Sequence, residues 1–158
     1  MSHRQAADAL VGHLARQSGL GHLALASDGS LALRIDGRFI VHLQADDEDC
    51  TLTLFAPVGT VRVDNALATC KDMLRANRFW RGTGGATLSL DAQEPPRAVL
   101  CEKVHCEAVS AAAFQACFER FVHNAGEWFD VLAEGGSTAA PPAAAPTAFD
   151  FAMGGLRA

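Results

Sequence analysis

The sequence has little positive charge. Its 158 residues include 13 Lys and Arg against 18 Asp and Glu, which gives a formal net charge of -5. Such a chain builds no positive field that would concentrate phosphate backbones or anionic lipid headgroups. We therefore expect no nucleic acid partner, and the length fits a single domain.

Long apolar runs are also missing. The first residues, MSHRQAADALVGHLARQ, mix polar and apolar positions. They lack the unbroken apolar segment that a signal peptide or a membrane span needs. We therefore expect no membrane insertion and a protein that stays in the cytoplasm.

Cysteine is scarce and shows no paired pattern. The five cysteines are an odd number, are widely spaced and mostly occupy apolar periodic positions, which is typical of reduced thiols packed as small hydrophobic groups. The run CEKVHC at 101–106 places two of them near a histidine, but the paired C-x-x-C knuckles of structural zinc sites are missing. We expect no disulfide scaffold, no metal and no cofactor.

The motifs of common reaction centres are missing as well. The six histidines are scattered, with no H-E-x-x-H pair and no G-x-S-x-G elbow to place a base beside a nucleophile. Turn formation accounts for Asp28 and Asp36, and a strand end accounts for Asp91. One alternative stays open, a small enzyme or ligand-binding domain that uses a cleft beside His22 and His42.

The sequence does contain clear changes of hydrophobic period. A capping box of Ser2 and Gln5, followed by apolar residues at helical spacing, predicts a helix over about residues 3 to 17. The period then falls to two, which predicts strands at GHLALAS (21–27), SLALRID (30–36), RFIVHLQ (38–44) and CTLTLFA (50–56). Asp-Gly pairs at 28–29 and 36–37 favour hairpin turns between the first three. The pattern indicates an antiparallel meander.

The second half alternates between helical and strand spacing. A helix is expected over about residues 64 to 77, then strands at ATLSLDA (86–92) and RAVLCEKV (97–104), then a long helix from Ser110 with an apolar stripe that reaches Leu132. After Glu134 the composition shifts to GGSTAAPPAAAPTA. We therefore expect a domain of residues 1–134 and a flexible tail of residues 135–158. The terminal FDFAMGGLRA leaves open a short motif that docks onto this protein or onto a partner.

Glycines in the stretch RANRFWRGTGGATLSLD at 75–91 lie between an expected helix and an expected strand. A phosphate-binding loop has the opposite order, because it follows a strand and opens a helix. These glycines are therefore expected to allow a tight backbone path into the sheet.

The order of these elements resembles the class I type III secretion chaperones of the Tir-chaperone family. The resemblance covers roughly residues 5 to 133 and rests on LVGHLARQSGLGHLAL, SLALRIDGRFIVHL, LTLFAPVGTV, MLRANRFWRGTGGATLSLD and FQACFERFVHNAGEW. The pattern ANxFxxxTGGAxLxLD at 76–91 is fairly specific for that family. The resemblance implies an α+β fold, with helices packed on a twisted antiparallel sheet, in a homodimer.

The same resemblance implies a function without a reaction. A chaperone of this family binds the N-terminal segment of a secreted effector and keeps it soluble and export-competent in the bacterial cytoplasm, and the secretion ATPase is a further candidate partner. A regulatory protein of the same fold that sequesters a secretion regulator is the alternative.

Site residues follow from the family resemblance too. It places the dimer interface on the second helix and the strand after it, which here supply Leu67, Met73, Leu74, Phe79, Trp80, Leu88 and Leu90. It places effector segments on apolar patches near the first helix and the meander, with strand addition at a sheet edge as one mode of binding. The corresponding residues are Leu10, Leu14, Leu23, Leu25, Leu33, Ile35, Phe39 and Val41.

Overall fold

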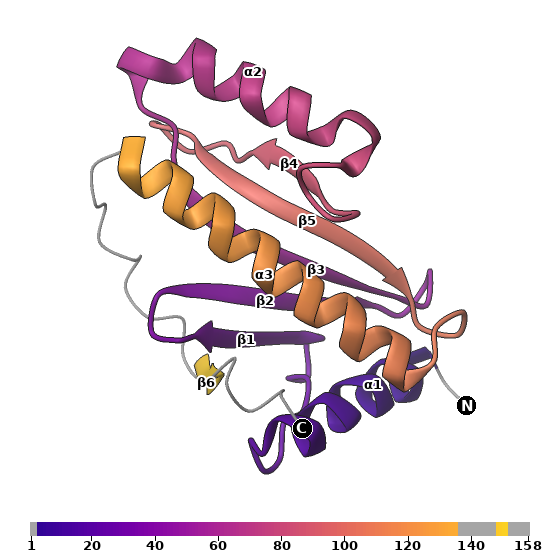
Figure 1. The fold of residues 1–158 in the computed structure, drawn as a ribbon. Helices are drawn as coiled ribbons and strands as arrows, with labels where there is room; N and C mark the ends of the chain where they lie inside the picture. Colours follow the sequence, from indigo (N-terminus) through magenta and orange to yellow (C-terminus); the bar gives the residue numbers. More distant parts are fainter. Residues whose placement is uncertain (1–2, 136–147, 152–158) are drawn as a thin grey trace.

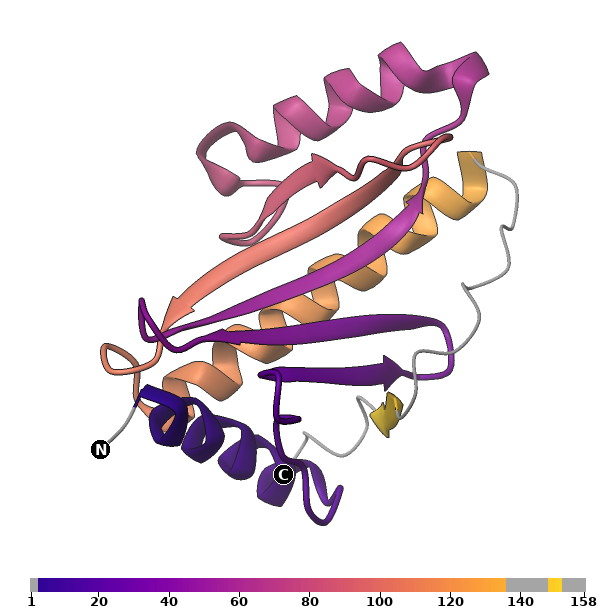
Figure 2. The same ribbon diagram turned by 180° about the vertical axis from the view of Figure 1, so that it is seen from behind.

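One six-stranded sheet organises the molecule. A computed structural model describes residues 3–135 and 148–151. The strand order is β4-β5-β3-β2-β1-β6. The helices are α1 (His3–Ser18), α2 (Ala66–Asn77) and α3 (Ala111–Gly135). Helix α3 crosses one face of the sheet, and α1 lies beside the first half of α3. Helix α2 lies along the β4 edge of the sheet (Figure 1). Figure 2 shows the opposite face, which no described helix covers.

Five of the strands pair with one another in antiparallel fashion, which confirms the predicted α+β class. They are β1 (Ser30–Ile35), β2 (Phe39–Asp46), β3 (Thr51–Thr60), β4 (Thr87–Leu90) and β5 (Arg97–His105). The turn from β1 to β2 uses Asp36 and Gly37 with φ of 49° and 69°. Asp-Gly suits this turn because both of its central residues need positive φ. The predicted helices and the last two predicted strands are also confirmed.

The prediction of a strand at residues 21–27 is wrong. This segment is irregular and ends in a turn, in which Gly29 N–H donates to the Ala26 carbonyl at 2.9 Å. Leu23 in this segment is buried in the core, so its alternating pattern reflects burial without strand pairing. The β1 edge on which this segment would have had to pair is occupied by β6.

Part of the expected tail forms that sixth strand. β6 (Ala148–Phe151) runs parallel to β1, with Ala32 opposite Ala148 and Ile35 opposite Phe151. Of the C-terminal motif, residues 149–151 thus dock onto the protein itself as part of β6. The rest of the tail, residues 136–147 and 152–158, lies outside the described residues, so the domain boundary at residue 134 stays a prediction.

The core lies between the sheet and the helices α1 and α3. Phe114, Phe118 and Phe121 are almost wholly buried and recur at helical spacing along α3. Alternate residues of β1 are buried, and α3 packs mainly on β3. Burying an apolar side chain of this size contributes about 1.5–3 kcal/mol. Of the helices within residues 3–135, none is long and apolar enough to cross a membrane.

Candidate functional site

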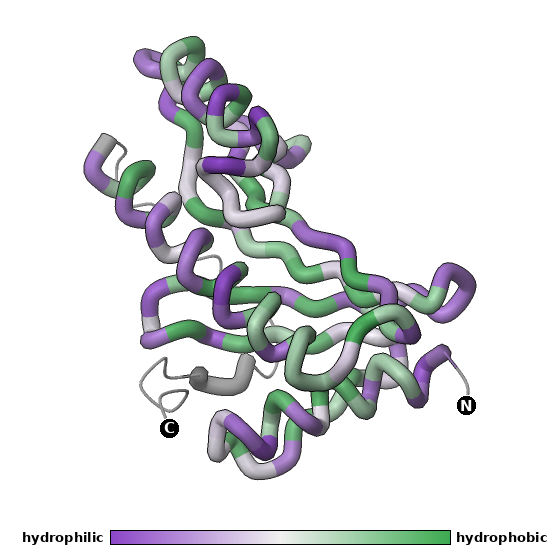
Figure 3. The backbone as a smooth tube through the Cα atoms, turned by 45° about the vertical axis from the view of Figure 1, so that its right-hand side comes forward, coloured by the Kyte–Doolittle hydropathy of each residue, from purple (hydrophilic) through white to green (hydrophobic). Residues whose placement is uncertain are grey.

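Helix α2 is poorly covered by the rest of the subunit. Met73 is its one buried side chain, whereas Leu67 and Leu74 are each 70 % exposed and lie seven residues apart on the same side. Figure 3 shows α2 projecting from the body of the molecule with apolar segments along it. Short helices owe most of their stability in proteins to a packed apolar face. The exposed leucines therefore leave an apolar face of α2 uncovered in the single subunit.

Two exposed aromatic residues follow α2 directly. Phe79 is 71 % exposed and Trp80 is 55 % exposed. Both have a left-handed backbone, with φ of 55° and 53°. This conformation costs a non-glycine residue roughly 1–2 kcal/mol. The chain thus accepts backbone strain at two successive residues whose rings face solvent, and such outliers cluster at functional positions.

Close packing fixes the position of this turn. Asn77 makes two hydrogen bonds to Leu88 of β4, donating from Nδ2 to its carbonyl at 2.9 Å and accepting from its N–H at 2.8 Å. Gly82 lies against Ala76, where an added Cβ would come within 2.7 Å of the alanine Cβ. Trp128 of α3 donates its ring N–H to the Gly82 carbonyl at 2.9 Å. The glycine therefore allows the tight backbone path that the sequence predicted.

Five of the seven residues expected at a dimer interface are exposed, and they come from α2, the turn that follows it and β4. We call them the α2 surface: Leu67, Leu74, Phe79, Trp80 and Leu90. The other two, Met73 and Leu88, are buried where α2 meets β4 and have almost no surface to offer a partner. The interface itself stays a prediction.

A second candidate surface is the outer edge of β1, formed by the backbone of residues 32–35. It pairs with β6 in parallel register. An open strand edge presents unpaired N–H and C=O groups that accept another extended segment. The pairing therefore demonstrates, within one chain, that this edge accommodates a strand.

The side chains expected to form effector-binding patches lie mostly in the core. They come from α1, the segment before β1, and strands β1 and β2, and have little surface in the described structure. Leu10, Leu14, Leu23, Leu33, Ile35, Phe39 and Val41 are each 6 % exposed or less, and Leu25 is partly buried. Direct contact between these seven side chains and an effector would require α1 or α3 to move, so their role stays a prediction.

The two histidines of the enzyme alternative are not on neighbouring strands. His22 is exposed in the irregular segment before β1. His42 lies on β2 and stacks on Phe55 of β3, with ring centroids 4.8 Å apart and planes 11° apart. Burial, with a smaller contribution from the charge of Arg97, lowers the pKa of His42. The structure therefore gives this alternative no support from paired histidines.

The aspartates have the structural roles that the sequence predicted. Asp28 accepts hydrogen bonds from the Ser30 hydroxyl at 2.6 Å and from its N–H at 3.0 Å, and these bonds hold the pKa of Asp28 below its usual value. Asp91 closes the β4–β5 connection through the Arg97 backbone N–H at 2.8 Å and the guanidinium at 2.6 Å. Burial raises the pKa of Asp91, but the bonds from Arg97 outweigh it and the net shift is downward. These carboxylates serve turns and strand ends.

The structure is an α+β domain with an exposed apolar surface and a β1 edge that pairs with β6, and its described residues include no recognised reaction centre. The family model for the Tir chaperone protein (CesT) family matches residues 9–129, well over half of the chain. The chain therefore belongs to this family, which confirms the resemblance carried by ANxFxxxTGGAxLxLD. No curated protein sequence matches the chain.

Solved structures share this fold at low sequence identity. The ExsC–ExsE complex matches with a TM-score of 0.69 and 21 % identity, over 91 % of this chain and 100 % of that one. The HopA1–SchA chaperone–effector complex matches with a TM-score of 0.65 and 17 % identity, over 83 % and 95 %. The Yersinia pestis type III secretion chaperone SycH, in complex with a fragment of YscM2, matches with a TM-score of 0.62 and 22 % identity, over 77 % and 98 %.

Proposed function

We propose that this protein is a type III secretion chaperone, acting as a homodimer in the bacterial cytoplasm, that holds the N-terminal segment of a secreted effector in a soluble, export-competent form. The observation that carries the proposal is the β1 edge with a strand already paired on it, in a chain of the CesT family. The HopA1–SchA structure, which shares the fold, is itself a chaperone–effector complex. The secretion ATPase is a further expected partner.

The α2 surface supports the homodimer. It combines leucines from α2 with two aromatic rings and Leu90, all exposed in the single subunit. A two-fold dimer brings the same patch of both subunits together, so one apolar patch covers the other. Aromatic residues surrounded by smaller apolar groups are the usual anchors of such interfaces.

The β1 edge supports the binding of an extended effector segment. Backbone pairing at an edge needs no particular sequence, which suits a partner that is held unfolded. In this proposal the effector segment takes the place of β6 on residues 32–35. The chain's own C-terminal strand therefore covers the edge until a partner displaces it.

Hydrogen exchange on the full-length protein tests this assignment. We would mix the protein with N-terminal segments of candidate effectors, measure mass by light scattering, and follow amide exchange in residues 32–35 and 148–151. We expect a dimer that captures one of the segments, with continued protection of β1 and faster exchange in β6. A stable monomer that captures no segment would overturn the proposal.

Proline substitutions in β6 sharpen the experiment. Successive N–H groups of a strand point to opposite sides, so the double variant Phe149→Pro, Asp150→Pro removes one donor that faces β1 and leaves the edge easier to occupy. Losing about 1.4 kcal/mol of β6 pairing would tighten effector binding about tenfold. Asp150→Ala, which keeps its N–H, is the matched control. Unchanged affinity in the proline variant would show that β6 does not compete with the effector.

A cellular experiment separates this function from the regulatory alternative. Deleting the gene should lower export of the bound effector while transcription of the secretion genes stays unchanged. The reverse pattern, with altered transcription and normal export, would instead assign the protein to the regulators.

A further inference from the structure

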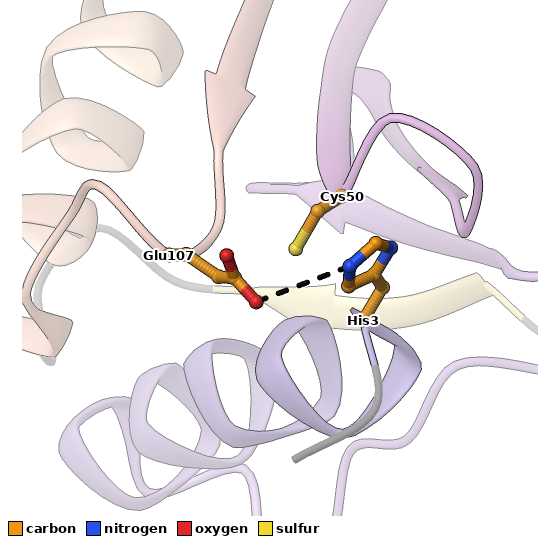
Figure 4. Close-up of side chains that lie close together, drawn as sticks. All are labelled: His3, Cys50 and Glu107. Carbon is orange, nitrogen blue, oxygen red and sulfur yellow. Dashed lines mark ion pairs between the residues drawn. The ribbon is translucent and has the colours of Figure 1, made fainter.

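Three side chains from distant parts of the sequence converge beside the start of α1. His3 belongs to the first turn of α1, Cys50 to the turn between β2 and β3, and Glu107 to the turn that follows β5 (Figure 4). Their ligand atoms, an imidazole nitrogen, a sulfur and a carboxylate oxygen, all lie within 4.8 Å of one another. The approach of His3 Nε2 to Glu107 Oε1 is 4.0 Å.

The hydrogen bond on the other side of the His3 ring orients it. Nδ1 lies 2.6 Å from the backbone carbonyl of Asp47, which can only accept, so Nδ1 carries a proton. In the neutral ring Nε2 then holds a lone pair that faces Glu107. A histidine that donates one N–H to a carbonyl and presents the other nitrogen as a ligand is the usual arrangement at metal sites. The lone pair of His3 Nε2 and the Glu107 carboxylate are both electron-rich, so a cation between them would be attracted by both.

Cys50 occupies a backbone conformation that cysteine rarely adopts. Its φ is 53°, in the left-handed region, and its side chain is buried with the sulfur toward the other two groups. Glycine or asparagine would fit such a turn with less strain, so turn geometry does not account for a cysteine. Its thiol also meets that of Cys106, which is buried next to it. Burial, with a contribution from the Glu107 charge, raises the pKa of the Cys50 thiol.

We propose that His3, Cys50 and Glu107 bind a divalent transition metal ion of the Zn²⁺ class, with the Cys106 thiol or a water as fourth ligand. Zn²⁺ accepts nitrogen, sulfur and carboxylate ligands together in four-coordinate sites. Mg²⁺ and Ca²⁺ prefer oxygen ligands only. Zinc–ligand bonds of about 2.0–2.3 Å require ligand atoms roughly 3.3–3.8 Å apart, so Glu107 has to close in slightly. Its exposed side chain is free to do so.

Binding would fasten the first turn of α1 to both turns at this end of the sheet. The Cys50 thiol loses its proton to the solvent when the metal–sulfur bond forms, and no oxidation is involved. Affinity should therefore fall as the pH falls, because protons compete for the sulfur and the imidazole. This site is independent of the proposed function, since it contains no residue of the α2 surface or of the β1 edge.

Cobalt and zinc titrations of the chelator-treated, full-length protein test the site. We expect one equivalent of Co²⁺ to produce the thiolate charge-transfer absorption of tetrahedral cobalt, and Zn²⁺ to displace it. Cys50→Ser should remove the whole of that absorption if water is the fourth ligand, and about half of it if the Cys106 thiol is. Glu107→Gln should weaken binding about tenfold or more. Cys70→Ser and His13→Gln, which change residues outside the cluster, are the matched controls and should bind as the unmodified protein does.

Two results would overturn the metal site. One is unmodified protein that binds no stoichiometric Co²⁺ or Zn²⁺. The other is a folded Glu107→Gln variant that binds both ions with unchanged affinity, or a folded Cys50→Ser variant that keeps the full absorption of the unmodified protein. Because Glu107 is exposed, its substitution keeps the test valid even if Cys50→Ser fails to fold.

Discussion

Trp80→Ala should weaken the homodimer strongly while leaving the subunit folded. Trp80 is 55 % exposed in the single subunit. A buried tryptophan hides up to about 250 Å², so roughly 140 Å² of this ring is available to a partner. At about 25 cal/mol per Å², and after allowance for the remaining alanine, covering it contributes about 2 kcal/mol. A two-fold dimer contains two copies, so the dissociation constant should rise by nearly a thousandfold.

Sedimentation velocity over a concentration series measures this change directly. Ile40→Ala is the matched control, because Ile40 is a partly buried apolar residue on the helix-free face of β2, away from the α2 surface. The control should dimerise as the unmodified protein does. If Trp80→Ala has the same dissociation constant as the unmodified protein, the ring lies outside the interface and the reasoning from its exposure and strain is refuted.

Three further predictions concern the subunit. Asn77→Ala should lower the free energy of unfolding in urea by about 2–3 kcal/mol, because both hydrogen bonds to Leu88 are lost. Gly84→Ala should lower it too, by about 1–2 kcal/mol or more, because Gly84 has φ of 62° and its added Cβ would come within 2.4 Å of an α3 side chain. Asp91→Asn should destabilise the protein at neutral pH, and this difference should disappear in acid, because Arg97 depresses the pKa of Asp91 only in the folded state.

An aspartate with a depressed folded-state pKa stabilises the protein above the unfolded value of about 3.9, and that stability is lost as the pH falls through the folded-state pKa. A difference for Asp91→Asn that persists in strong acid would contradict the ion-pair explanation. Gly19→Ala has positive φ but open space around it, so it separates the cost of conformation from that of crowding. An Asn77→Ala variant as stable as the parent would mean that water replaces both bonds.

The spacing of apolar residues and the Asp-Gly turns predicted most of the fold. The alternation in SLALRID and RFIVHLQ, with Asp-Gly between them, leads to the observed hairpin because local pattern and local turn agree. The segment 21–27 has the same alternation but no available edge, since the strand that pairs there comes from residues 148–151. The spacing of apolar residues cannot show which of two segments, far apart in the sequence, pairs with the outer edge of β1.

The candidate site was predicted less completely. Exposure at Leu67, Leu74 and Trp80 agrees with an interface, but spacing along α2 could not distinguish the buried Met73 from its exposed neighbours. The positive φ of Phe79 could not be predicted from the sequence, because it depends on how the whole turn at residues 78–85 packs against the rest of the subunit. The sequence did not predict the cluster of His3, Cys50 and Glu107, because its members are far apart along the chain. The only close cysteines and histidine in the sequence are those of the CEKVHC run, and of these it is Cys106 that lies beside the cluster.

The side chain of Asn77 has a consequence for the behaviour of the protein at high concentration. By holding both backbone groups of Leu88, it seals the outer margin of β4 with an amide that a further strand cannot extend. A further strand therefore cannot pair with β4 at Leu88, which disfavours the edge-to-edge growth of a fibre, because such growth requires two open edges on every copy. For the chaperone proposed above, this contact would lower the tendency to polymerise with itself.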